Sequence, residues 1–92
     1  MTQDGYLKAR ALLLECEKEL NAALDRLKDA RKHRQGEEVV KARQQAEEAE
    51  RNLEQALADA KRAWHEYWAT QPGYKKDPEP ETNVLMRAEA II

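Results

Sequence analysis

The sequence contains no serine and no phenylalanine, and it has one cysteine, three glycines and three prolines among 92 residues. Without serine, the commonest hydroxyl nucleophile of enzymes is missing, and three scattered glycines provide no glycine-rich loop for binding phosphate. A single cysteine excludes an internal disulfide framework. No apolar run approaches the ~20 residues that a membrane-spanning helix needs.

Cys16, His33 and His65 remain as candidates for chemistry, and none is predicted to form a catalytic or metal site. Cys16 follows the apolar helical pattern described below, where a buried thiol acts as inert packing. His33 and His65 lie far apart in the sequence and are predicted to be solvated surface residues. We therefore expect a non-enzymatic protein that needs no metal and no cofactor.

The charge balance does not favour general nucleic-acid binding, and the start of the sequence favours a cytoplasmic protein. Sixteen Lys and Arg oppose 18 Asp and Glu, giving a formal net charge of -2. The first 20 residues lack the basic start and apolar middle of a secretion signal. A single domain of this length buries only ~60–65% of its unfolded surface, so association with a partner is favoured.

Two long segments, residues 4–34 and 39–70, repeat their apolar residues every seven positions, which is typical of coiled-coil helices. The a positions hold mostly leucine, alanine and tyrosine: Tyr6, Leu13, Leu20 and Leu27, then Val39, Ala46, Leu53, Ala60 and Tyr67. The d positions hold seven alanines and one cysteine: Ala9, Cys16, Ala23 and Ala30, then Ala42, Ala49, Ala56 and Ala63. Such small side chains let two helix backbones approach closely.

The heptad phase breaks at residues 31–38, "RKHRQGEE", which contain nothing apolar. Basic residues before Gly36 suit a helix C-terminus, and Glu37 and Glu38 suit a helix N-terminus. We therefore predict an all-α fold, an alanine-rich antiparallel hairpin over residues 1–71 with helices at about 4–34 and 37–70. One continuous helix is the alternative. We also expect the hairpin to assemble into a helical bundle.

Four of the five aromatic residues fall within residues 63–74, "AWHEYWATQPGY": Trp64, Tyr67, Trp68 and Tyr74. Folding the chain at Gly36 pairs a positions whose numbers sum to 73, which places Tyr6 opposite Tyr67. All the aromatic residues then lie away from the turn. The predicted rod has a charged tip and an aromatic base.

Residues 72–92 are predicted to be a linker followed by a short C-terminal interaction segment. Residues 72–80 hold all three prolines and favour an extended chain. Thr82 is the predicted N-cap of a short helix with one apolar face, formed by Val84, Leu85, Ala88, Ile91 and Ile92. A strand and a disordered segment are the alternatives.

A second apolar stripe runs along the b and e positions of the hairpin, outside the a and d seam. An exposed stripe of this kind usually marks an interface; cover by the C-terminal tail is the alternative. The predicted protein interface consists of Leu7, Leu14, Leu24, Leu57, Trp64, Tyr67, Trp68, Leu85, Ile91 and Ile92. The partner is another protein or a second copy, with a homodimer favoured.

Adaptors, assembly factors and inhibitors, including those of phages and mobile elements, are small proteins of this kind, and a structural subunit of a larger assembly is equally open. The basic tip gives a second hypothesis, in which Arg31, Lys32 and Arg34 contact nucleic-acid phosphates. The tip has no aromatic residue to stack on bases. A protein-interaction module is therefore the leading prediction.

Overall fold

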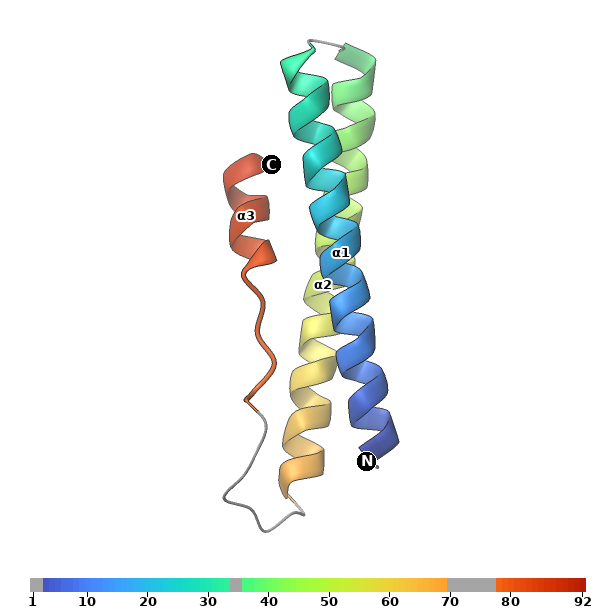
Figure 1. Ribbon diagram of the computed structural model, residues 1–92, viewed down its shortest axis with the longest axis vertical. Coiled ribbons are helices and arrows are strands. Elements are labelled where there is room, and N and C mark those ends of the chain that lie inside the picture. The colour runs from blue at the N-terminus through green and yellow to red at the C-terminus, as the bar shows by residue number, and fades with distance from the viewer. Residues whose placement is uncertain (1–2, 34–35, 70–77) are drawn as a thin grey trace.

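The computed structural model describes residues 3–33, 36–69 and 78–92. Three helices follow one another in the chain, α1 (Gln3–Lys32), α2 (Gly36–Ala69) and α3 (Val84–Ile91). Helices α1 and α2 pack side by side as an antiparallel hairpin, and α3 lies along one side of it (Figure 1). The molecule is a rod 55 Å long. The predicted all-helical hairpin is confirmed, and no described residue forms a strand.

Charges at the tip match the helix ends on either side of the turn. Helix α1 ends with Arg31 and Lys32, and α2 carries Glu37 and Glu38 in its first turn. These charges complement the partial charges of the helix termini. Gly36 is the first residue of α2, and a Cβ added there would meet no atom within 4 Å. There is therefore room for a side chain at position 36, and close neighbours are not the reason for a glycine there.

The two predicted seams form the core between α1 and α2. Every d position is buried except Ala9, which is partly buried. The a positions are buried apart from Val39 and Tyr67, which are partly buried. The rings of Tyr6 and Tyr67 stack with centroids 5.4 Å apart and planes 12° apart. This contact agrees with the register predicted for the a positions.

Helix α3 packs on the hairpin through the apolar face predicted from the sequence. Ala88 is fully buried, and four partly buried residues pack around it against the core: Val84, Leu85, Ile91 and Ile92. Helix α3 contacts both α1 and α2. The C-terminal segment is therefore a helix that packs on its own chain. Of the predicted linker, residues 72–77 lie outside the described part, and Pro78–Pro80 lie outside any helix.

The start of α3 differs by one residue from the sequence prediction. Asn83, rather than Thr82, is the N-cap, and its side chain makes no capping hydrogen bond. The Thr82 hydroxyl instead accepts a hydrogen bond from the Val84 backbone N–H at 3.2 Å. A threonine hydroxyl can satisfy the N–H two residues later in a local turn as well as cap a helix.

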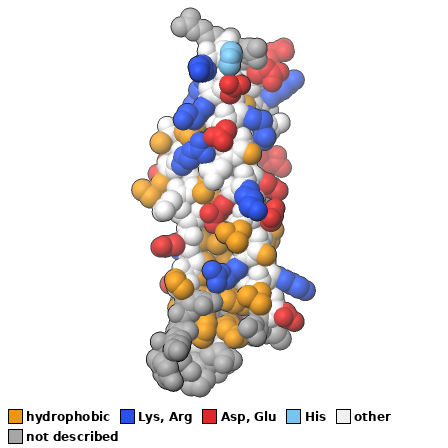
Figure 2. Space-filling model, viewed as in Figure 1, with side chains coloured by type: hydrophobic (Ala, Val, Ile, Leu, Met, Phe, Trp, Pro, Cys, Tyr) orange, Lys and Arg blue, Asp and Glu red, His pale blue; other side chains and the backbone are white. Residues whose placement is uncertain are grey.

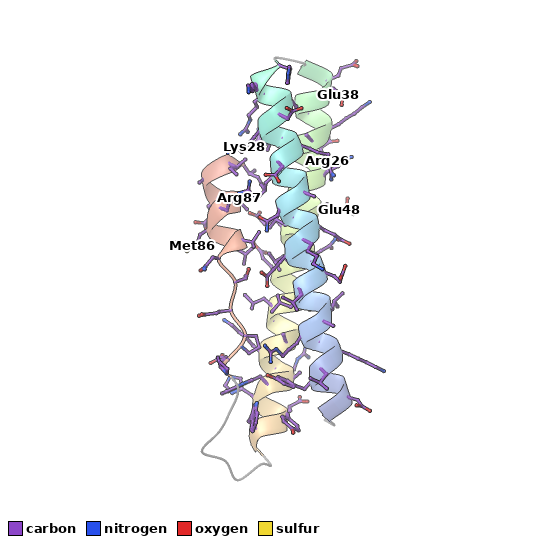
Figure 3. The ribbon with its side chains drawn as sticks, in the orientation of Figure 1. Arg26, Lys28, Glu38, Glu48, Met86 and Arg87 are labelled. Carbon is purple, nitrogen blue, oxygen red and sulfur yellow. The ribbon has the colours of Figure 1, made fainter. Side chains whose placement is uncertain are left out.

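Polar contacts hold α3 against α1. Arg87 reaches from α3 toward α1 (Figure 3) and donates to Asn21 Oδ1 at 2.7 Å. Its guanidinium also pairs with the Asp25 carboxylate. Near the end of α3, Arg31 donates to the Ile91 carbonyl oxygen. These contacts fix α3 both along and across the hairpin.

Candidate functional site

The structure separates the predicted interface residues into three groups. The first lies where α3 packs: Leu24 is fully buried and Leu57 partly buried, while Leu85, Ile91 and Ile92 of α3 pack against the same core. The second, at the aromatic base, is partly buried: Trp64, Tyr67 and Trp68. The third, Leu7 and Leu14 on α1, is exposed. The third group is therefore the most accessible of the three to another molecule.

Leu7, Ala11 and Leu14 lie along one line of α1, and we call them the outer stripe. The exposed fractions of Leu7 and Leu14 are 50% and 58%, and Ala11 is also exposed. A spacing of four and then three residues places all three on one helix face. Hydrophobic side chains are most concentrated on the lower part of the molecular face shown in Figure 2, toward the base of the rod. The outer stripe lies in the half of α1 that is nearer to the base of the rod.

A small groove of about 200 Å³ borders the outer stripe. Its α1 wall includes Leu13, Leu14 and the two charged residues Arg10 and Glu17, and its other wall is the segment 78–81. Because Leu14 belongs both to the stripe and to the groove, the two form one continuous surface. This surface has an apolar centre and charged edges.

The aromatic base is held by ring contacts. The Tyr67 and Trp68 rings meet edge to face with centroids 5.0 Å apart, and Trp64 meets the His65 ring in the same way at 4.9 Å. His65 Nε2 lies 3.3 Å from Glu79 Oε1. His65 is thus exposed, as predicted, but it also links α2 to the returning chain. Tyr74 lies outside the described residues.

Trp68 is the one described residue with a buried side-chain polar atom that lacks a hydrogen-bond partner, its indole N–H. Leaving a buried donor unsatisfied costs about 1–3 kcal/mol. Because the Trp68 ring still contacts Tyr67, it contributes packing to the base at this cost. The aromatic base therefore contains one buried hydrogen-bond donor, the Trp68 indole N–H, that lacks an acceptor.

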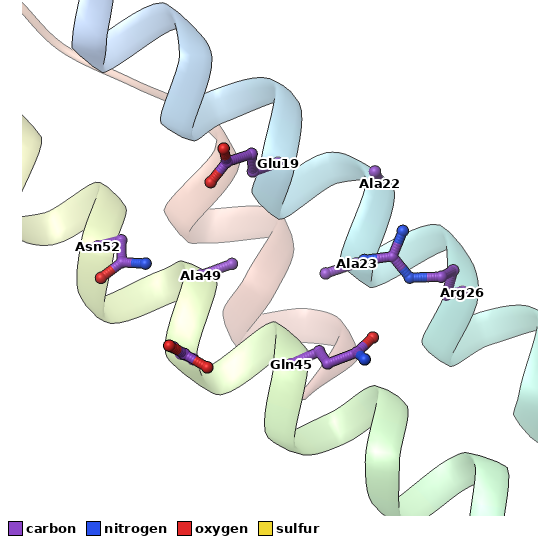
Figure 4. A pocket seen from close by; sticks show the side chains of 8 residues that line it. Glu19, Ala22, Ala23, Arg26, Gln45, Ala49 and Asn52 are labelled. Atoms are coloured by element: carbon purple, nitrogen blue, oxygen red, sulfur yellow. The ribbon is translucent and has the colours of Figure 1, made fainter.

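The opposite face of the hairpin carries a second groove (Figure 4). The groove has a volume of about 340 Å³, with Ala23 and Ala49 at the seam and charged or amide side chains around them. A neighbouring depression of about 280 Å³ shares Arg26 and Gln45 with it. The rim of the 340 Å³ groove mixes acidic and basic groups, including Glu19 and Arg26. The small alanines leave this groove open.

The predicted nucleic-acid contacts lie at the tip among acidic residues. Arg31 and Lys32 are exposed, and Arg31 is hydrogen-bonded to Ile91. His33 Nδ1 lies 3.5 Å from the Asp29 carboxylate. Arg34 lies outside the described residues. Asp29 of α1 and Glu37 and Glu38 of α2 interrupt the basic surface.

Two titratable groups have shifted pKa values. Burial, followed by the nearby charges of Glu19 and Glu15, raises the pKa of the Cys16 thiol. A raised pKa keeps the thiol protonated and unreactive, as expected for a packing residue. Burial also raises the pKa of Glu50, with further contributions from Glu54, Glu89 and Glu47. Within the described ranges, no group of three or more histidine, cysteine or acidic side chains could hold a metal ion.

The contacts that dock α3 were missed by sequence reasoning. Arg87 and its acceptors on α1 are more than 60 positions apart in the chain. A heptad pattern reports neighbours on one helix, and it does not say which distant polar groups an arginine meets. The sequence offered only the charged residues Arg87 and Glu89 on an otherwise apolar helix as a signal.

Among the described helices, none is both long enough and apolar enough to cross a membrane. A scan against protein-family models, a search of curated proteins and a search of solved structures each found no match to this chain.

Proposed function

We propose that this chain is a non-enzymatic protein-interaction module that binds another protein surface through the outer stripe of α1. The observation that carries the proposal is the exposure of Leu7 and Leu14 on one line of a helix whose inner seam is already fully packed. Leucines with half of their surface in water gain free energy when a partner covers them. The partly buried Trp64, Tyr67 and Trp68 of the aromatic base would add to the contact, because Tyr and Trp contribute strongly to interface energies.

The packing of α3 on the hairpin makes the accessible interface smaller than the one predicted from the sequence. Helix α3 packs where Leu24 and Leu57 would otherwise meet a partner, so the middle of the predicted stripe is used within the chain. In the part of the chain that the structure describes, Leu7 and Leu14 in the lower half of α1 remain exposed. An adaptor, assembly factor or inhibitor in the cytoplasm, or a subunit of a larger assembly, would use this half for contact.

Nucleic-acid binding has less support. Phosphate contact needs a concentrated positive charge, whereas Asp29 precedes the basic run at the tip and Glu37 and Glu38 follow it. Arg31 also donates to the C-terminal helix. Protein contact therefore remains the function that the surface supports best.

The test compares proteins retained from the source cells by the wild-type chain and by a Leu7→Gln, Leu14→Gln double variant. Both leucines are exposed, so glutamine should leave the fold intact, which circular dichroism checks. Val40→Gln is the matched control, because Val40 is 57% exposed but lies at the tip. A retained protein, or a second copy of this chain, should be lost with the double variant and kept with the control. Identical retention by all three would reject the proposal.

A further inference from the structure

The outer stripe has the spacing of a second coiled-coil seam. Leu7, Ala11, Leu14 and Lys18 are separated by four, three and four residues, and all four are exposed. Alternating intervals of three and four residues mark the a and d positions of a heptad. Helix α1 therefore has one seam packed against α2 and a second that faces away from the core.

The charges beside this second seam are arranged in a regular way. One flank holds Lys8 and Glu15, each one residue after a leucine of the stripe. The other flank holds Arg10 and Glu17, each three residues after a leucine. On both flanks a basic residue is followed seven positions later by an acidic one. When two such helices run antiparallel, each flank faces the same flank of its neighbour, so that opposite charges meet.

We propose that the outer stripe binds a second copy of this chain, with the two α1 helices antiparallel and Ala11 of each packed against Leu14 of the other. The inference rests on the proposed function, since it names the partner of the same surface. In this register Lys8 lies beside Glu15 of the second copy, and Arg10 lies beside Glu17 of the second copy. Twofold symmetry repeats both pairs, which gives four complementary contacts.

Other registers are less favourable. Moving one helix by a heptad puts Lys8 beside Lys8 and Arg10 beside Arg10 of the second copy, and facing like charges destabilise a helix pair. A parallel pair would instead form one complementary contact, between Arg10 and Glu15 of the second copy. It would also pack Lys18 against Lys18 in the seam. The charges thus select the antiparallel register.

The residues at both ends of the seam are compatible with this pairing. Leu7 faces Lys18 of the second copy, whose aliphatic stem can cover the leucine while its ammonium group stays in water. Arg10 contacts the Tyr6 ring and hydroxyl within its own chain, and its five N–H donors allow a further pair with a carboxylate. The contact covers about three helical turns, which is small for a permanent interface, so the dimer should be weak and reversible.

Sedimentation equilibrium of the full chain over a wide concentration range tests the pairing. Wild type should show a reversible monomer–dimer equilibrium. The Leu7→Gln, Leu14→Gln double variant should raise the dimer dissociation constant at least tenfold, whereas Val40→Gln should leave it unchanged. A wild type that stays monomeric, or a dimer insensitive to the leucine substitutions, would overturn the proposal.

Charge exchange tests the register itself. Lys8→Glu alone places two carboxylates opposite each other on one flank, and Glu15→Lys alone places two ammonium groups opposite each other there. Each variant should therefore dimerise more weakly than wild type. An equimolar mixture of the two variants restores both contacts on that flank, and a heterodimer should form with nearly wild-type affinity. Failure of the mixture to recover would refute this register.

The outcomes also separate this inference from the proposed function. If the chain is monomeric but still retains another protein through Leu7 and Leu14, the second copy is excluded as the occupant and the interaction surface stands. If the leucine variants change neither self-association nor retention, both proposals are wrong.

Discussion

Alanine side chains determine how closely α1 and α2 approach each other. Ala56 is 3% exposed and lies in the seam, whereas Ala58, two positions later, points into solvent. Tightly packed interiors respond to each added methylene group, because neighbouring side chains and backbone must move to accommodate it. The seam should therefore tolerate enlargement far less than the surface of the same helix.

Ala56→Leu should destabilise the hairpin by about 1–3 kcal/mol because the larger side chain overpacks the seam. Ala58→Leu is the matched control on the solvent face of α2, and it should change stability little. Chemical denaturation followed by circular dichroism measures both. Equal effects of the two substitutions would contradict the observed seam.

Among the elements, α3 is the one whose docking depends on few contacts. It has eight residues, and isolated helices of that length are unstable in water. Its helical state therefore depends on packing around Ala88 and on the contacts of Arg87 and Arg31 with the rest of the chain. By contrast, α1 and α2 stabilise each other along their whole length.

Ala88→Asp should release α3 from the hairpin, because Ala88 is fully buried and a carboxylate cannot be placed there without a partner. Hydrogen exchange of residues 84–92 should become much faster, while protection in α1 and α2 is largely retained. Ala90→Asp, at an exposed position of the same helix, serves as the control. Equal protection of α3 in the two variants would show that Ala88 does not anchor it.

The two long helices could be predicted from sequence, and the docking of α3 could not. The pattern from Tyr6 to Leu27 and from Val39 to Tyr67 carries its own register, and the stacked Tyr6 and Tyr67 rings are found where that register places them. The short α3 has one apolar face, which can pack on any exposed apolar stripe. Its location depends on Arg87 meeting Asn21 and Asp25, which no local repeat encodes.

The candidate surface was predicted only in part for the same reason. The sequence marks Leu7, Leu14, Leu24 and Leu57 as members of one stripe, but exposure depends on which part of the stripe α3 occupies. The structure leaves Leu7 and Leu14 exposed and buries Leu24 fully. Residues of the same type and pattern therefore differ in their availability to a partner.

At the scale of the whole molecule, α3 meets an opposite charge on α1 and a like charge on α2. Arg87 pairs with Asp25 of α1, whereas Glu89 raises the pKa of Glu50 on α2 by repulsion. Burial is the larger cause of the raised Glu50 pKa, and Glu54 and Glu47 add to it. The folded chain therefore binds a proton at Glu50 more tightly than the unfolded chain does.

This linkage predicts how stability depends on pH. The stabilising contribution of protonated Glu50 is complete below its ordinary pKa of 4.5 and is lost as the pH rises through the higher folded-state value. At pH 7 the charged Glu50 opposes folding, so the neutral variant Glu50→Gln should be more stable than wild type. The advantage should disappear as the pH falls below 4.5. Denaturation midpoints between pH 4 and 7 measure it.

Glu48→Gln is the control for the pH experiment, because Glu48 is exposed and lines the groove on the face away from α3. It should show no comparable gain at pH 7. A Glu50→Gln variant that is less stable than wild type at pH 7 would mean that the carboxylate helps to hold the fold.

The alanine seam also constrains how this protein can evolve. Single-base changes in an alanine codon lead to glycine or to larger residues such as valine, threonine, serine, proline, aspartate and glutamate. Glycine weakens a helix by about 1 kcal/mol, and the larger residues overpack or leave polar groups buried. Nearly every amino-acid substitution that such a change makes at the seam is therefore harmful, while the solvated faces outside the outer stripe can change freely. Descendants of this chain should keep the seven-residue period of small side chains long after the rest of their sequences have diverged.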